Sequence, residues 1–316
     1  MLPVAGKFLN FTATGFFMPP TELFSIEPFL NYLKFQKRYS QHTLCAYETD
    51  LRDFFEFIEF SYDATPVPEL SAPMIRSWLA ELKEKKLTSK SINRKISALK
   101  SYFKFQLRTG MISISPMATI ISLKVNKRLP SYIEEKDMNT LFQHVEFPDT
   151  WEGKTDRLLL LIFYHTGIRL SELVNLKTSQ IDRSNSNIKV LGKGNKERVI
   201  PVNNDLVKQM MNYIEDKLQL EDADNEFLLV NSRGKKLYQR QVYTIVKTYL
   251  SLVTTNARKS PHILRHTFAT HLTNNGADIN AVKELLGHSG LASTQVYTHN
   301  SIEKLKDIHR QAHPKS

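Results

Sequence analysis

Apolar residues recur at three- and four-residue spacing through four successive stretches between Thr21 and about Gly110. The stretches are IEPFLNYLKFQ, LCAYETDLRDFFEFI, APMIRSWLAELKEK and SINRKISALKSYFKFQL. This period places the apolar side chains on one face of a helix, so each stretch predicts an amphipathic helix. Residues that favour the N-cap position precede the last three helices: Ser40 or Thr43, Ser71, and Thr88 or Ser89. The first part of the chain is therefore expected to be a helical domain.

The segment ISPMATIISLKVNKRLP interrupts this pattern. It contains two prolines and basic residues but no sustained period, which predicts a linker. The expected organisation is an unassigned extension at 1–20, a helical domain at 21–115, a linker at 116–131 and a second domain at 132–316 that ends in a tail. A chain of 316 residues is long enough for two domains with separate cores.

The second domain is expected to be mainly helical with a small β-hairpin. Two runs rich in β-branched residues flank a glycine-containing turn, GKGNKER, which predicts strands at 187–191 and 197–202. EFLLV adds a candidate short strand. Helices are predicted at about 134–145, 154–166, 204–218, 238–254, 263–275, 278–286 and 292–298, with a short helix from Leu170. The fold class is thus mainly α with a small β-hairpin or sheet, an α+β arrangement.

The chain is strongly basic, with a net charge of +11 and a pI near 9.5, which favours a polyanionic partner. Nine basic residues and one acid lie between Lys83 and Arg108. Such a cluster binds phosphates through counterion release, although a solvated helix surface explains it equally well. The candidate DNA contacts are Lys90, Arg94, Lys95 and Lys104.

No apolar run is long enough to cross a membrane, and the N-terminal segment before Met18 lacks a convincing signal-peptide cleavage site. The single cysteine, Cys45, excludes an internal disulfide and fits a reducing compartment. A cytoplasmic location is expected, with Cys45 as a packed core thiol.

The segment SPHILRHTFATHL contains three histidines and an arginine. His262 and His266 have the i, i+4 spacing of a helical zinc pair, but Ile263 stands where a zinc protease would have glutamate. No nearby carboxylate completes a ligand set, so no metal is expected. His262 and Arg265 lie one turn apart on one helix face, where two donors suit a phosphodiester. Taken alone, Arg265 would more readily be explained by an ion pair.

Other candidates are spread along the second domain. Arg169 follows Gly167 at the start of a helix, and Lys193 lies between two glycines in the predicted turn. Downstream, the segment LLGHSGLASTQVYTH contains His288 and, nine residues later, Tyr297.

These segments resemble the tyrosine recombinases of the phage-integrase family, and most closely the Xer-type bacterial site-specific recombinases. The resemblance is carried by TGIRLSELVNL, GKGNKERVIPV, HILRHTFATHL, LLGHSGLASTQVYTH and HRQAHPKS, in that order. The N-terminal half is similar to the core-binding domain of the family through SQHTLCAYETDL and SINRKISALKSYF.

The resemblance implies a two-domain clamp on double-stranded DNA with Tyr297 as the nucleophile. Five further residues would surround the scissile phosphate: Arg169, Lys193, His262, Arg265 and His288. Tyrosine attack would give a 3′-phosphotyrosyl intermediate, and strand exchange would pass through a Holliday junction. The chemistry is consistent, because arginines stay charged at working pH and can stabilise the pentacoordinate phosphorus. Which histidine accepts the tyrosine proton stays open.

The resemblance also implies a homo- or hetero-tetramer on two duplexes, a related recombinase as partner, and a DNA translocase as regulator. The expected role is chromosome or plasmid dimer resolution. Three alternatives remain at this point: an integrase or invertase of a mobile element, a non-catalytic DNA-binding protein of the same fold, and a metal-dependent nuclease.

Overall fold

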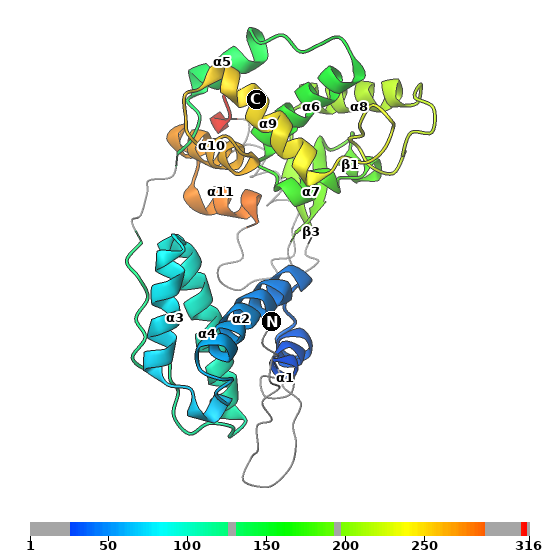
Figure 1. The fold of residues 1–316 in the computed structure, drawn as a ribbon. Coiled ribbons are helices and arrows are strands. Elements are labelled where there is room, and N and C mark those ends of the chain that lie inside the picture. The colour runs from blue at the N-terminus through cyan, green and yellow to red at the C-terminus, as the bar shows by residue number, and fades with distance from the viewer. Residues whose placement is uncertain (1–25, 126–130, 193–196, 288–310, 315–316) are drawn as a thin grey trace, which may run out of the picture. The chain divides into compact units, whose positions relative to one another are not determined.

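The computed structural model describes residues 26–125, 131–192, 197–287 and 311–314. The chain forms two compact units, Met1–Arg128 and Leu129–Ser316 (Figure 1). Within the described ranges, no helix combines the length and the apolar character that a membrane span needs.

The first unit is helical, as its apolar spacing predicts. Its α1 continues directly into a short π-helix, and a 3-10 turn precedes α3. The elements are α1 (Glu27–Asn31), η1 (Tyr32–Gln36), α2 (Gln41–Ser61), η2 (Val67–Glu69), α3 (Ala72–Glu84) and α4 (Ser89–Arg108). Ser40 caps α2, Thr88 caps α4 and Ser71 occupies the N-cap of α3.

Aromatic rings fill the core of the first unit. Phe54 of α2 meets Trp78 of α3 edge to face, with ring centroids 5.0 Å apart. Tyr102 and Phe103 of α4 lie fully buried beside them. Edge-to-face contacts of this kind add to the free energy of burial, so the three long helices form one packed body. Cys45 departs from expectation because it lies on the exposed side of α2 rather than in the core.

The second unit combines eight helices or helical turns of its described residues with one small sheet (Figure 1). Its helical elements are α5 (Glu135–Gln143), α6 (Trp151–Thr166), α7 (Leu170–Val174), η3 (Thr178–Gln180), α8 (Asn204–Lys217), α9 (Gln239–Val253), α10 (Pro261–Asn274) and α11 (Ile279–Leu286). The predicted helix at 292–298 lies outside the described residues.

The sheet has three antiparallel strands in the order β1–β2–β3. The predicted hairpin is present as β2 (Asn187–Leu191) and β3 (Glu197–Pro201), with Leu191 opposite Glu197. The strand β1 (Ile181–Asp182) was not predicted from the sequence. EFLLV forms no strand in the described structure and makes only isolated bridges, one of them between Lys177 and Phe227.

Helix α6 is the centre of the second unit. Its residues 158–164 are all buried, because an apolar surface on every side of a helix must be covered by neighbours. Helix α10 packs against it, and its Leu264 is part of the same core, whereas Phe268 and Leu272 are buried against α11. At the end of α6, Gly167 adopts a left-handed conformation with φ of 56°, and a Cβ there would come within 2.5 Å of the Phe268 ring. A larger residue here would be strained and would displace the Phe268 ring.

The described part of the C-terminal tail contacts its own unit. Ala312 is buried against α10 and α11, and the side-chain amide of Asn275 donates to its carbonyl oxygen at 2.8 Å. The His313 ring stacks on that of His165 with centroids 4.7 Å apart, and its Nε2 lies 3.0 Å from the carbonyl oxygen of Tyr164. Ala312 and His313 therefore complete the core beside α6 and α10.

Candidate active site

Arg169 occupies the N-cap of α7. It follows Ile168 and Gly167, of which Gly167 has the left-handed conformation. Its Nη1 donates to Oε1 of Glu172 at 2.7 Å, and its main-chain N–H donates to Oε2 of the same carboxylate at 2.8 Å. Its Nη2 donates to the carbonyl oxygen of Gly287 at 2.8 Å. The side chain is held by two hydrogen bonds and still has 29% of its surface exposed, so it can meet a ligand from solvent.

Arg265 lies on α10, buried to 8% exposure. Its Nη1 donates to the carbonyl oxygen of Gly167 at 2.6 Å, and its Nη2 donates to the carbonyl oxygen of Leu286 at the end of α11. The fold thus brings together Arg169 and Arg265, which are separated by almost a hundred positions in the chain. The sequence also allowed an ion pair as the role of Arg265. Arg265 forms no ion pair with the described residues.

Two further residues of this cluster were not singled out from the sequence. Arg198 of β3 donates from Nη1 and Nη2 to the two oxygens of Glu172, both at 2.7 Å, and from Nε to the carbonyl oxygen of Leu285 at 3.1 Å. Arg198 and Glu172 are almost completely buried. Three guanidinium groups around one carboxylate leave an excess of positive charge, which suits a phosphate.

The charges of the cluster shift the pKa values of Glu172 and Arg265. Burial raises the pKa of the Glu172 carboxyl, but hydrogen bonds and charge from Arg198 and then Arg169 outweigh it and hold the pKa at about 2. Burial lowers the pKa of Arg265 to about 10, and the like charges of Arg169 and Arg198 add to the effect. Glu172 is therefore ionised and Arg265 charged at neutral pH. An anion beside Arg265 would relieve this repulsion.

His262 lies one turn before Arg265 on α10 and is exposed. The other three predicted residues, Lys193, His288 and Tyr297, lie outside the described residues. Among the side chains that are described, no three His, Cys, Asp or Glu residues cluster as they would around a metal ion.

The four candidate DNA contacts on α4 differ from one another. Lys90 and Lys104 are exposed. Arg94 is exposed but donates to Oδ2 of Asp50 at 2.6 Å. Lys95 is buried, bonds both Asp50 and Asp53, and lies over the Trp78 ring, so its ammonium group is committed to the fold rather than offered to DNA.

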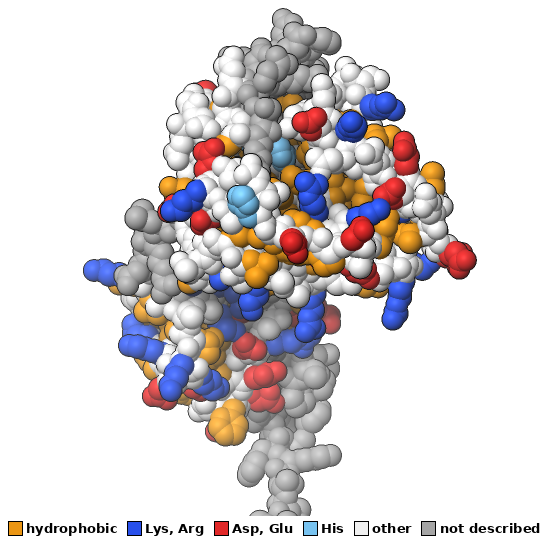
Figure 2. All heavy atoms as spheres, turned by 90° about the horizontal axis from the view of Figure 1, so that it is seen from above, with side chains coloured by type: hydrophobic (Ala, Val, Ile, Leu, Met, Phe, Trp, Pro, Cys, Tyr) orange, Lys and Arg blue, Asp and Glu red, His pale blue; other side chains and the backbone are white. Residues whose placement is uncertain are grey.

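On the face of the second unit that Figure 2 presents, basic and acidic side chains are interspersed. Among its described residues, this face has no extended area that is only basic or only acidic. A DNA backbone is bound best by a continuous basic surface, so this face is not a good candidate for that contact.

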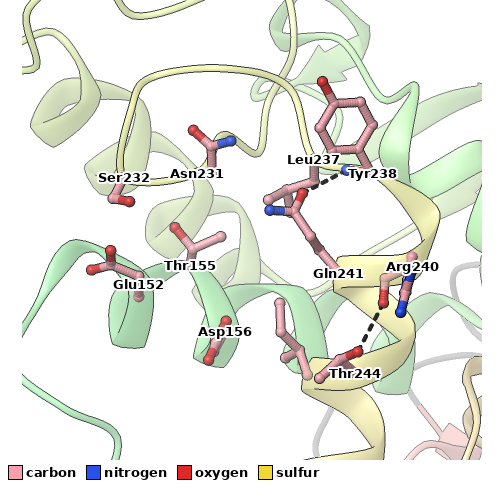
Figure 3. A pocket seen from close by; sticks show the side chains of 11 residues that line it. Glu152, Thr155, Asp156, Asn231, Ser232, Leu237, Tyr238, Arg240, Gln241 and Thr244 are labelled. Carbon is pink, nitrogen blue, oxygen red and sulfur yellow. Dashed lines mark hydrogen bonds between the residues drawn. The ribbon is translucent and has the colours of Figure 1, made fainter.

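A separate cavity of about 620 Å³ lies between α6, α9 and the segment before α9 (Figure 3). Thr155 and Asp156 line it from α6, and Gln241 and Thr244 line it from α9. None of the residues predicted to carry the chemistry lines it. Burial raises the pKa of Asp156 to about 6, against the lowering effect of a hydrogen bond from Tyr249.

Replacing this carboxylate should stabilise the protein in a pH-dependent manner. A raised folded pKa means that the ionised Asp156 opposes folding, and this penalty grows as pH rises through about 6. We expect Asp156→Asn to add about 1 kcal/mol at pH 8, after allowance for partial exposure, and little at pH 4. The melting temperature should rise by about 2 to 4 °C at pH 8. Calorimetry at both pH values, with Glu221→Gln as a matched exposed control, checks this. Equal shifts at the two pH values would contradict it.

Two family models match the chain. The model of the Phage integrase family matches residues 131–304, which is more than half of the chain. The model of the Phage integrase, N-terminal SAM-like domain matches residues 26–110.

Curated relatives match over nearly the whole length. Tyrosine recombinase XerC of Chlorobaculum parvum is 34% identical, with 92% of this chain and 94% of the relative covered. Tyrosine recombinase XerC of Thermodesulfovibrio yellowstonii is 37% identical, with 93% and 97% covered. Tyrosine recombinase XerC of Staphylococcus aureus is 37% identical, with 92% and 96% covered.

Two solved structures with a similar fold are complexes with DNA. XerH site-specific recombinase bound to palindromic difH substrate aligns with a TM-score of 0.67 and 21% identity, over 92% of this chain and 83% of that one. The Tn1549 transposon integrase in complex with circular intermediate DNA aligns with a TM-score of 0.68 and 20% identity, over 91% and 98%. At this level of identity the likeness concerns the fold.

Proposed function

This chain belongs to the phage integrase family and is a tyrosine-type site-specific DNA recombinase, and we propose that Tyr297 is the nucleophile with which it cuts DNA. The phenol oxygen attacks the scissile phosphorus, and the 5′ oxygen of the strand leaves. The product is a 3′-phosphotyrosyl bond, which conserves the energy of the phosphodiester, so no nucleotide cofactor is required. Attack by a 5′ hydroxyl of another duplex completes the exchange through a Holliday junction.

The observation that carries this proposal is the meeting of Arg169 and Arg265 at one place. Two guanidiniums can hold the non-bridging oxygens and stabilise the negative charge that develops at phosphorus. The hydrogen bonds to Gly167, Leu286 and Gly287 fix both side chains before DNA arrives. Little reorganisation is then needed in the transition state, which is the source of electrostatic catalysis.

The remaining roles are assigned by chemistry. A phenol has a pKa of about 10 and needs a base, so His262 or His288 accepts its proton or donates to a phosphate oxygen. Lys193, in the segment between β2 and β3, protonates the leaving 5′ oxygen. Lys90 and Lys104 of α4 contact phosphates of the recombination site, and the exposed Arg94 joins them.

The cellular role that we propose is resolution of chromosome or plasmid dimers in the cytoplasm. The similarity to three XerC recombinases, 34–37% identical over more than 90% of the chain, supports it. In this role four protomers, identical or paired with a related recombinase, hold two duplexes, and a DNA translocase regulates them. Integration of a mobile element remains the second candidate, because the same chemistry serves both reactions and only the DNA target separates them.

Mapping the DNA that becomes covalently joined to the protein in its host tests this role. We expect covalent DNA at one fixed chromosomal site, and cutting that persists in a chelator, because the arginines replace a metal ion. Covalent DNA at the ends of a mobile element would instead favour the integrase. An absence of covalent DNA would favour the non-catalytic alternative, and loss of cutting in the chelator would favour the metal-dependent nuclease.

A further inference from the structure

The C-terminal end of α11 is held by three arginines from three different elements. The carbonyl oxygen of Leu285 accepts from Arg198, that of Leu286 from Arg265 and that of Gly287 from Arg169. Carbonyl groups in the last turn of a helix lack partners within the helix and carry partial negative charge. The arginines therefore fix the position of α11 relative to α7, α10 and β3.

Of the three, Arg198 faces the protein rather than solvent. It is 4% exposed, and its guanidinium is bonded through Nη1, Nη2 and Nε to Glu172 and Leu285. With all three nitrogens of its guanidinium bonded inside the protein, Arg198 is not placed to bind a phosphate of DNA. Any effect of Arg198 on the reaction must pass through the residues it contacts.

The first of these is Glu172, which Arg198 shares with Arg169. Oε1 of Glu172 accepts from both guanidiniums, and Oε2 accepts from Arg198 and from the main-chain N–H of Arg169. If Arg198 were absent, the carboxylate would be neutralised by Arg169 alone. The Arg169 guanidinium would then turn toward Glu172 and present less of its charge to an incoming phosphate.

The second contact is with the chain that leaves α11. Gly287 has a left-handed φ of 62°, and a Cβ built on it would lie 3.0 Å from Cδ of Arg198. The main chain thus passes directly over the Arg198 side chain, and the next residue in the sequence is His288. Arg198 also belongs to the strand that follows the segment containing Lys193.

We propose that Arg198 is a positioning residue for the cleavage reaction. It neutralises Glu172 so that Arg169 stays directed at the phosphate, and it anchors the end of α11 from which the chain continues to His288. This inference rests on the proposed function, since it assigns Arg198 a role relative to Arg169 and His288.

The test compares three variants on a nicked suicide substrate at saturating protein. Arg198→Lys keeps the charge but cannot bond both carboxylate oxygens and Leu285, and Arg198→Met removes the charge. Each should slow covalent capture about 100-fold, as expected for a misplaced catalytic group, with DNA affinity within about threefold of wild type. Arg157→Lys, an exposed arginine on α6 that donates to Gln209, is the matched control and should cleave normally.

The decisive variant is the double replacement Glu172→Gln/Arg198→Met. Without the carboxylate charge, nothing draws Arg169 away from the phosphate, so the double variant should cleave about tenfold faster than Arg198→Met alone. A merely structural role predicts a double variant as slow as the single one or slower, and that result would overturn the proposal. Cleavage by both single variants within threefold of wild type would overturn it too. If the wild-type protein forms no covalent complex through Tyr297, the proposed function itself fails, whatever Arg198 does.

Discussion

Replacing Arg265 with lysine is expected to slow covalent cleavage of DNA about 1,000-fold while DNA binding changes by less than about threefold. Arg265 is buried, and its two terminal nitrogens hold the carbonyl oxygens of Gly167 and Leu286. A guanidinium has five N–H donors, so it can hold both oxygens and still present donors to a phosphate. A lysine ammonium is a point donor without this fork. The loss of one oriented donor to a developing anion costs about 100-fold to 1,000-fold in rate.

Single-turnover cleavage of a nicked duplex, with affinity measured separately by titration, separates the two effects. His266→Gln is the matched control, because His266 is the next residue on α10 and is exposed. It should cleave within about twofold of wild type. A modest effect of Arg265→Lys on cleavage would show that Arg265 acts only through its charge, which lysine keeps. A loss confined to binding would show that Arg265 holds the DNA before the reaction and not in the transition state. Either result would contradict the prediction.

The helices could be predicted from the sequence because their signals are local. Apolar spacing, together with the caps at Ser40 and Thr88, marked α2 and α4 to within a few residues. The start of α6 at Trp151 was placed three residues late, because Thr150 caps it through a bond to Gly153. Strand β1 was missed because a strand of two residues is too short to show an alternating apolar pattern. It is recognised only by its hydrogen bonds to β2.

The interpretations that failed depend on contacts that spacing does not reveal. Lys95 was grouped with the basic surface of α4, yet Asp50 and Asp53 of α2 lie opposite it and draw it into the interior. Cys45 was expected in the core because its neighbours are apolar, but it lies one position past the buried Leu44, on the other face of α2.

In the arginine cluster, too, the residues in distinctive local segments could be predicted and the residues defined by distant contacts could not. Arg169 and Arg265 were singled out because each lies in a distinctive segment with other donor residues. Glu172 lies in TGIRLSELVNL and Arg198 in GKGNKERVIPV, but their roles follow from pairing across 26 residues and from contact with Leu285, 87 residues beyond Arg198. An acid in a helix and an arginine in a strand are ordinary residues until such contacts are known. Several arginines near one phosphate repel one another and need a carboxylate partner. A search for such a carboxylate near Arg169 could have found Glu172.

The largest effect of all is expected from Tyr297→Phe, which removes one oxygen atom and nothing else. Without the phenol oxygen no phosphotyrosyl bond can form, while the arginine cluster that we propose binds the phosphate is unchanged. Covalent capture should fall at least about 1,000-fold, to background, because the remaining groups supply no nucleophile. DNA affinity should stay within about threefold of wild type. Tyr238→Phe, which alters an exposed tyrosine before α9, should capture DNA normally.

The most direct measurement is therefore covalent capture of an end-labelled nicked suicide substrate by wild-type protein and by Tyr297→Phe, followed by mass spectrometry of the DNA-linked peptide. The predicted result is a linked peptide containing Tyr297 in the wild type and no linked species in the variant. Undiminished capture by Tyr297→Phe, or a link at another residue, would contradict the proposed mechanism.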